Sequence, residues 1–293
     1  TVADKDHVVA IGDIVTYTIE AYVPFIDAAN TGKRTFTITD EITGADYYLT
    51  GPNSVNSVTM EGKEDQVGTI VVNEAGTGFT IDLNNLVADT ANPNAGKKIT
   101  VTYTAKVKEV TVENNAGSHA AGVDYGGENV PVKLFTGDLV LLKYGDGDLN
   151  NVLANAEFVL YKDGEEAPLT FTKQRDGKYK YAPDAEDASA TLVTDENGMI
   201  YVEGLDVGSY HFEETKAPKG YSINTDGKTL TLTVEGEVAT AKLYNEGRLN
   251  DTKLNALPST GGMGTYLFTI IGVVVMAGAA GAFFISRRKG SEE

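Results

Sequence analysis

The residue types that usually carry enzyme chemistry are sparse in this sequence and do not cluster. The chain of 293 residues has no Cys and three scattered His residues, His7, His119 and His211. We find no Ser-His-Asp, Cys-His or paired-carboxylate arrangement and no spacing typical of a metal site. The sequence therefore predicts no metal and no cofactor, and it indicates that the chain is not an enzyme.

The C-terminal tail combines three features in a fixed order. A short segment comes first, made of Leu257, Pro258, Ser259, Thr260 and Gly261. Proline fixes its own φ angle and favours an extended conformation in the residue before it, so such a segment can enter an enzyme groove. An uncharged apolar stretch follows at 266–285, and then a basic triplet at 287–289. About 20 apolar residues are enough to cross a bilayer, and basic residues after them favour a cytoplasmic C-terminus. We expect one transmembrane helix at 266–285, with everything before it outside the cell.

This tail resembles the cell-wall sorting signal of Gram-positive surface proteins, in which an LPxTG motif precedes a hydrophobic span and a positive tail. The resemblance implies that sortases are partners of the chain. Sortases use a Cys thiolate to attack the Thr-Gly carbonyl, here Thr260-Gly261, and then pass the Thr acyl group to an amine. The implied location is the cell wall, with the chain anchored to peptidoglycan after a membrane-inserted precursor stage.

The composition fits an external protein without disulfides. The formal net charge is -18, and an acidity of that size argues against nucleic-acid binding and favours solubility at a crowded surface. Without Cys, no disulfide can brace the fold. The chain begins at Thr1 without the leader that an exported protein needs, so we expect an N-terminal portion to be missing.

The dominant period along the chain is two, which is typical of β-strands. Residues 14–19, 35–39, 99–104 and 229–234 alternate β-branched or aromatic residues with Thr, and Asp-Gly or Asn-Gly turns separate many such runs. We predict an all-β protein of two tandem Ig-like β-sandwiches followed by the transmembrane helix. The predicted domains are 1–133 and 134–249, and residues 250–293 form the spacer, sorting signal and tail.

The second predicted domain carries a motif at residues 213–221 with the sequence Glu-Glu-Thr-Lys-Ala-Pro-Lys-Gly-Tyr. It resembles the E-box of Gram-positive pilins and of collagen-adhesin B-type (CnaB) domains, whose core reads E-T-x-A-P-x-G-Y. In that family, a Lys of the first strand condenses with an Asn of the last strand, with the E-box Glu as catalyst. The resemblance assigns these roles to Lys143, Asn245 and Glu214.

The chemistry of such a bond can be argued from the side chains. An amine attacks a carboxamide only when it is neutral, and burial among apolar side chains disfavours the charged amine. Burial also raises the pKa of a Glu, so that its proton can polarise the carboxamide and move to the leaving ammonia. Folding supplies the effective concentration for a reaction that occurs once.

The first predicted domain resembles the A-type (CnaA-like) middle domain of backbone pilins, through residues 12–19 and 36–40. The resemblance implies a second isopeptide bond, with Asp40 as catalyst and Asn114, or alternatively Asn115, as acceptor. No Lys lies where the nucleophile is expected, so we expect it upstream of Thr1. Lys5 is a poorer candidate because it lies in a polar, turn-like segment.

Together these resemblances favour the major, SpaA-like subunit of a covalently polymerised pilus (fimbria). They imply peptidoglycan, neighbouring pilin subunits and host surface ligands as further partners. The pilin-motif Lys that would accept the next subunit is absent, since the chain has no Tyr-Pro-Lys. The alternative is a wall-anchored adhesin or a minor pilin of the tip or base. Sequence ahead of Thr1 would discriminate between them, because a pilin-motif Lys favours a backbone subunit and a large binding domain favours an adhesin.

Overall fold

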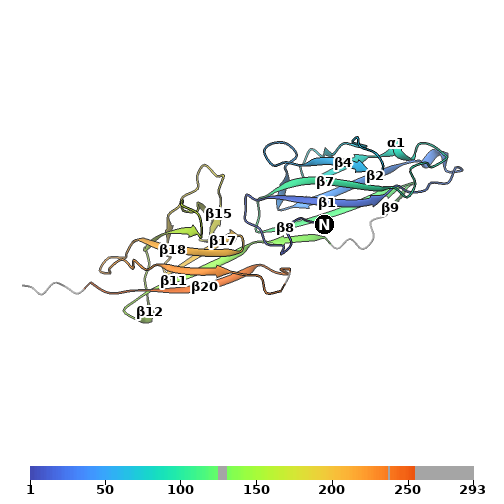
Figure 1. Ribbon diagram of the computed structural model, residues 1–293. Helices are drawn as coiled ribbons and strands as arrows, with labels where there is room; N and C mark the ends of the chain where they lie inside the picture. Colours follow the sequence, from blue (N-terminus) through green and yellow to red (C-terminus); the bar gives the residue numbers. More distant parts are fainter. Residues whose placement is uncertain (125–130, 237, 255–293) are drawn as a thin grey trace, which may run out of the picture. The chain divides into compact units, whose positions relative to one another are not determined.

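The computed structural model describes residues 1–124, 131–236 and 238–254. Thr1–Thr252 form one compact unit. This unit is built almost entirely from strands, which confirms the predicted all-β class (Figure 1). Two very short helices interrupt the strands of the described part, η1 (Thr31–Lys33) and α1 (Asn84–Val87).

The first sandwich consists of two sheets from the N-terminal half of the chain. One sheet has the order β1-β7-β3, with β4 also paired to β7, and the other has the order β10-β8-β2-β6-β5, with β9 paired to β8. The bounds are β1 (Ile14–Tyr22), β2 (Phe36–Thr43), β3 (Ala45–Tyr47), β4 (Asn56–Met60), β5 (Val71–Val72), β6 (Gly78–Asp82), β7 (Lys98–Val107), β8 (Thr111–Ala120), β9 (Val123–Asp124) and β10 (Val132–Phe135).

The second sandwich repeats this plan with the strands that follow Thr136. One sheet has the order β12-β11-β17-β15-β14, with β20 paired to β11, and the other has the order β16-β13-β18-β19. The bounds are β11 (Gly137–Gly145), β12 (Asp148–Val152), β13 (Glu157–Lys162), β14 (Phe171–Lys173), β15 (Tyr179–Tyr181), β16 (Leu192–Val193), β17 (Met199–Leu205), β18 (Gly208–Lys216), β19 (Lys228–Leu232) and β20 (Leu243–Asp251).

The alternating pattern of the strands produces two separate cores. In β7, the buried side chains include Ile99, Val101 and Tyr103, which belong to the first core. In β11, Leu139 and Leu141 belong to the second core. Successive side chains of a strand point to opposite faces, so Lys143 shares the inward face with these two leucines. The β-pattern thus places a lysine in an apolar interior.

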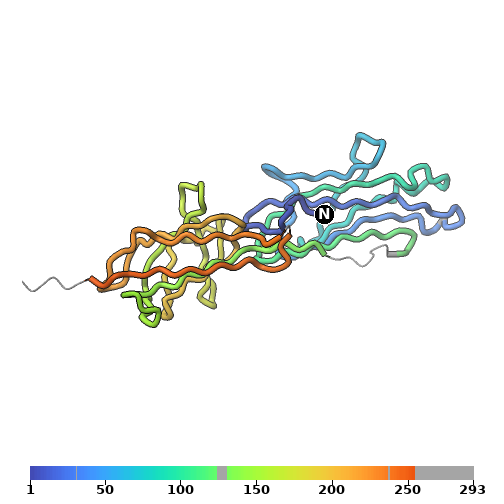
Figure 2. The backbone as a smooth tube through the Cα atoms, turned by 60° about the horizontal axis from the view of Figure 1, so that its bottom comes forward, coloured from blue at the N-terminus to red at the C-terminus, as the bar shows by residue number. Residues whose placement is uncertain are grey.

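The first and last strands of the second sandwich lie side by side. β11 and β20 pair in parallel, from Gly137 opposite Leu243 to Gly145 opposite Asp251. In Figure 2 the last strand, coloured orange to red, runs beside the green trace of β11. The predicted boundaries at 133 and 249 fall inside β10 and β20, respectively. The strand pairing therefore extends each sandwich by two residues beyond the predicted end.

Candidate cross-linking site

The second core contains a buried lysine that contacts the E-box glutamate. Lys143 on β11 is completely buried, and Glu214 on β18 is 4% exposed. The Lys143 Nζ atom lies 3.2 Å from Glu214 Oε2. The structure therefore brings together two of the three residues that the resemblance assigned to the cross-link.

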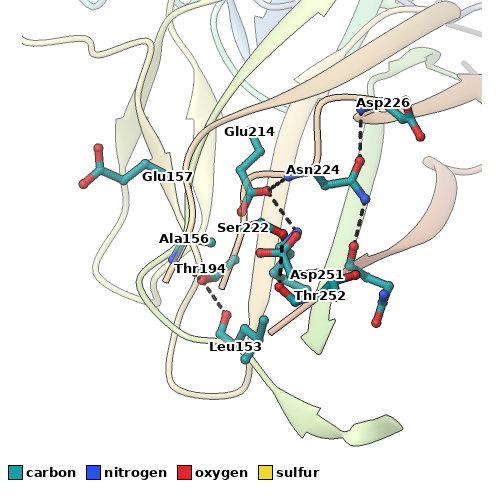
Figure 3. A network of polar contacts seen from close by, with 12 residues as sticks. Leu153, Ala156, Glu157, Thr194, Glu214, Ser222, Asn224, Asp226, Asp251 and Thr252 are labelled. Atoms are coloured by element: carbon teal, nitrogen blue, oxygen red, sulfur yellow. Dashed lines mark hydrogen bonds and ion pairs between the residues drawn. The ribbon is translucent and has the colours of Figure 1, made fainter. Parts of the chain in front are cut away.

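The third group at this site is the carboxyl of Asp251. Asp251 is the last residue of β20 and is 1% exposed. Its Oδ1 atom forms the closest polar contact of Lys143 Nζ. Figure 3 shows Glu214 and Asp251 at this cluster, and they come from strands of the two different sheets, β18 and β20. One amine thus lies between two carboxyls inside the core.

The structure places Asn245 elsewhere on β20. In the parallel register Asn245 lies opposite Leu139, whereas Lys143 lies opposite Leu249. Asn245 is therefore displaced along the strand from Lys143 by four residues, which is about 13 Å. This distance is too long for the Lys143 side chain, whose Nζ atom lies at Asp251. The Asn245 Nδ2 atom donates to the carbonyl oxygen of Thr231 at 2.7 Å instead. The pairing of β11 and β20 therefore separates Asn245 from Lys143 and brings Asp251 to it.

The electrostatics of the cluster favour an additional proton. If Lys143, Glu214 and Asp251 were all ionised, the core would hold one uncompensated negative charge, which is costly without water. Burial raises the pKa of the Glu214 carboxyl, and the Asp251 charge adds to this effect. The Asn224 N–H and Lys143 oppose it. A protonated carboxyl at this site relieves the excess charge.

Two carboxyl oxygens of the cluster have no hydrogen-bond partner. Glu214 Oε1 and Asp251 Oδ2 are buried and unpaired among the described residues. The Phe158 ring lies 5.6 Å from Lys143 Nζ and closes another side of the site. Unsatisfied buried oxygens cost free energy, and they are common at groups with a chemical role. The arrangement holds a nucleophile, a carbonyl carbon and a proton carrier in contact, away from water.

The first sandwich contains a second buried polar cluster around Asp40. Asp40 on β2 is 2% exposed, and its Oδ1 atom accepts hydrogen bonds from the hydroxyls of Tyr47 at 2.8 Å and Tyr103 at 2.9 Å. Burial raises the pKa of Asp40 to about 6, although the two tyrosine hydroxyls lower it. Asn114 on β8 is 6% exposed, and its Nδ2 atom donates to the Tyr103 hydroxyl. The structure thus links Asp40 to Asn114 through one tyrosine.

A small cavity lies at this second cluster. It has a volume of about 150 Å³, and Thr1 is among the residues that line it. Three buried oxygens of its lining have no hydrogen-bond partner among the residues that the structure describes, namely Tyr17 Oη, Asp40 Oδ2 and Asn114 Oδ1. Asn115 also lines the cavity but is exposed, and Lys5 is exposed and outside the lining. Of the two candidate acceptors, Asn114 is the one buried beside Asp40.

The sorting motif at 257–261 and the expected transmembrane helix at 266–285 lie outside the described residues. Within the part of the chain that the structure describes, no helix is long and apolar enough to cross a membrane. The same part contains no group of three or more His, Cys, Asp or Glu residues arranged to hold a metal ion.

Sequence reasoning missed Asp251 for a specific reason. The predicted domain ended at 249, so the last two residues of β20 were not considered as strand. A signal was present in the sequence, because Gly247, Leu249 and Asp251 continue the two-residue alternation of the strand. The structure buries all three residues. A polar residue on the inward face of a terminal strand is uncommon, and here it identifies the group that faces Lys143.

These features define a class: a β-sandwich domain with a buried lysine, glutamate and aspartate, ahead of a wall-anchor motif. Residues 137–247 match the SpaA family, described as a prealbumin-like fold domain. Residues 250–292 match the LPXTG cell wall anchor motif. The chain therefore carries a SpaA-type domain and a cell-wall anchor motif, in the order that the tail and the E-box predicted.

Three known proteins illustrate the similarity. The trypsin-resistant surface T6 protein of Streptococcus pyogenes serotype M6 is 38% identical over 36% of this chain and 19% of its own length. The fimbrial subunit type 1 of Actinomyces viscosus is 25% identical over 95% of this chain and 62% of its own length. The chain thus spans less than two thirds of either relative. The crystal structure of the group B streptococcus pilus 2b backbone protein has a TM-score of 0.57 at 19% identity, and the match covers 88% of this chain and 99% of that one. This last similarity shows the fold.

Proposed function

We propose that the chain is a structural subunit of a covalently assembled pilus on a Gram-positive cell surface. Its anchor motif at 250–292 supports attachment to the cell wall by a sortase, with cleavage between Thr260 and Gly261. Its SpaA-type domain and its similarity to a fimbrial subunit support a place in the pilus shaft. In this role the protein bears load and turns over no substrate.

The subunit carries an internal isopeptide bond between Lys143 and Asp251, formed with the help of Glu214. The neutral Lys143 amine attacks Cγ of the protonated Asp251 carboxyl, and a C–N bond forms. Glu214, itself protonated, donates its proton to the departing hydroxyl and takes one from the attacking nitrogen, so the C–O bond breaks, one water leaves and Glu214 is again protonated. The site as a whole must be neutral for this step, with one proton more than the fully ionised cluster has.

The observation that carries this proposal is the contact of buried Lys143 Nζ with both carboxyls, Glu214 Oε2 at 3.2 Å and Asp251 Oδ1. An amine and a carboxyl held together without water have a high effective concentration. The first pair of candidates, Lys143 with Asn245, would release ammonia, whereas Lys143 with Asp251 releases water. The two bonds therefore differ in mass and in the peptide that they join.

The test is the intact mass of the folded unit 1–252, followed by peptide mapping. We expect a mass lower by one water and a branched peptide that joins Lys143 to Asp251. A folded chain with the unmodified mass would contradict the cross-link. Loss of ammonia together with a branch at Asn245 would contradict the choice of Asp251.

The first sandwich holds the receiving half of a second bond. The buried Asp40 and Asn114, with their unpaired oxygens around a cavity beside Thr1, fit a lysine side chain that enters from residues ahead of Thr1. Val2 pairs with Tyr17, so the chain before Thr1 would continue along β1 near this cavity. In a protein extended upstream, we expect loss of one ammonia and a branch at Asn114. A branch at Asn115, or none in a folded extended protein, would contradict this assignment.

A further inference from the structure

The loop between β18 and β19, residues 217–227, contacts the acceptor strand on both sides of Asp251. On one side, the Ser222 backbone N–H and hydroxyl both donate to the carbonyl oxygen of Thr252, at 3.0 and 3.1 Å. On the other side, the Asn224 Nδ2 atom donates to the carbonyl oxygen of Asn250 at 2.8 Å. The loop therefore holds the carbonyl groups of the two residues on either side of Asp251.

One residue of this loop also contacts the catalyst. The Asn224 backbone N–H donates to Glu214 Oε2 at 2.7 Å, the same oxygen that faces Lys143 Nζ. Figure 3 shows Asn224 between Glu214 and the end of β20. Its Oδ1 atom accepts the Asp226 N–H at 3.0 Å, which fixes the side chain in a turn. Asn224 thus connects the proton carrier to the acceptor strand.

The position of Asp251 explains why such a contact matters. Asp251 is the last paired residue of β20, opposite Gly145, and strand ends open more readily than strand centres. A reaction between buried groups depends steeply on their separation, and a displacement of about 1 Å can slow it about a hundredfold. At that end the Asp146 N–H, in the turn after β11, donates to the carbonyl oxygen of Asp251 at 2.8 Å. The loop after β18 adds contacts to the same end of β20 and, unlike that turn, also contacts Glu214.

We propose that Asn224 is a positioning residue for the cross-linking reaction, holding Asp251 and Glu214 in register with Lys143. This inference rests on the proposed bond between Lys143 and Asp251. Nothing in the E-box motif assigns a role to this residue, because Asn224 lies three residues beyond Tyr221, where the motif ends.

The positioning role has a signature in the pH dependence of the reaction. The charged groups that face Glu214 are Lys143 and Asp251, and the Asn224 N–H stabilises the ionised form of Glu214. If the loop loosens, the pKa of Glu214 rises further. The neutral site needs the Glu214 proton, so the reaction slows as pH rises through that pKa. Loosening the loop therefore moves this alkaline limb of the rate profile to higher pH.

The experiment compares the unit 1–252 with three variants, each isolated unfolded in urea and started by dilution into buffers of graded pH. Asn224→Ala removes both side-chain hydrogen bonds. Asn224→Ser keeps a side-chain oxygen that can accept a hydrogen bond from the Asp226 N–H. The serine side chain is too short to reach the carbonyl oxygen of Asn250. Asn150→Ala is the matched control, because Asn150 is exposed and, in the described part of the chain, its side chain bonds to Asp148 and not to the cluster. The readout is the rate of water loss by mass spectrometry, with circular dichroism to verify folding.

We expect both Asn224 variants to fold and to form the bond about tenfold or more slowly, with the alkaline limb shifted to higher pH, and Asn150→Ala to match the parent chain. Parent-like rates in both Asn224 variants would overturn the positioning role. A parent-like Asn224→Ser beside a slow Asn224→Ala would show that the turn, not the contact with Asn250, matters. Slow variants with an unshifted limb would mean that Asn224 does not act through Glu214, and would overturn that part of the positioning role. If the parent chain itself formed no bond, the proposed cross-link would fail, an outcome distinct from these.

Discussion

At the scale of single residues, the cluster of Lys143, Glu214 and Asp251 is hard to explain as a stabilising ion pair. All three side chains are at most 4% exposed, and burying charges costs about as much free energy as their attraction returns. Two of their oxygens lack hydrogen-bond partners within the described ranges of the chain. Such a cluster is reasonable as the state before a reaction, because the amide that forms carries no charge.

The role of Asp251 as the acceptor can be tested with two substitutions, one that keeps a side-chain carbonyl group and one that removes it. Asp251→Asn keeps an electrophilic carbon and is expected to form the bond with loss of ammonia, so its product has the same mass as the product of the parent chain. Asp251→Ala should form no bond. The Asn245 side chain binds the carbonyl oxygen of Thr231 and not Lys143, so Asn245→Ala should react as the parent chain does. A bond that survives in Asp251→Ala and disappears in Asn245→Ala would return the acceptor role to Asn245.

Asp40 should make the first sandwich less stable as pH rises. Its pKa is raised from 3.8 to about 6 by burial, so the folded state binds the proton more tightly than the unfolded state does. The stabilisation is complete below pH 4 and is lost as pH rises from about 4 to 6, by up to about 3 kcal/mol. Asp40→Asn should remove this dependence of the unfolding free energy on pH. The measurement is urea unfolding at several pH values, monitored by hydrogen exchange of the amides of β2 and β8. Glu41→Gln, at the exposed neighbour, should keep the slope; an unchanged slope in Asp40→Asn would exclude Asp40 as its source.

At the scale of elements, the strands were predictable and their registers were not. Alternation in residues 99–104 predicted β7, and it also places Lys143 on the inward face with Leu139 and Leu141. The E-box located Glu214. The partner of Lys143 depended on the parallel register of β11 and β20, which sequence alternation does not specify. The contacts of Asn224 depended on the path of a loop, for which the sequence has no periodic signal.

The bond between β11 and β20 should dominate the stability of the second sandwich. It joins residues that are 108 apart in sequence, and closing a loop of about that length removes unfolded-state entropy worth about 4–5 kcal/mol. Glu214→Gln should form no bond and should melt about 15 °C or more lower by calorimetry. The control is Glu213→Gln, because Glu213 is the exposed neighbour on β18. Equal melting temperatures in both variants, with the cross-link present in each, would remove Glu214 from the mechanism.

At the scale of the whole molecule, attachment depends on the tail that follows the second sandwich. In a Gram-positive host, Thr260→Ala should block cleavage, because the acyl carbonyl passed on by the sortase belongs to this residue in the LPXTG motif. The protein should then stay with the membrane fraction instead of the wall fraction released by muramidase. Ser259→Ala is the matched control, since it changes the variable position of the motif. Wall-linked polymer from Thr260→Ala would contradict sortase processing at this site.

The cross-link also determines how tension would pass through the second sandwich. Force that enters at the start of β11 and leaves at the end of β20 crosses directly from Lys143 to Asp251 when the two are bonded, so the residues between them carry no load. Those residues would otherwise extend by about 370 Å, at about 3.4 Å each. In single-molecule pulling of the unit 1–252, we expect this extension to be absent in the parent chain and in Glu213→Gln, and present in Glu214→Gln. A full-length extension in a chain whose mass shows the bond would mean that the load follows another path. Because Asp251 is the last residue of β20, the segment between the two bonded residues, which carries no load, is nearly the entire second sandwich.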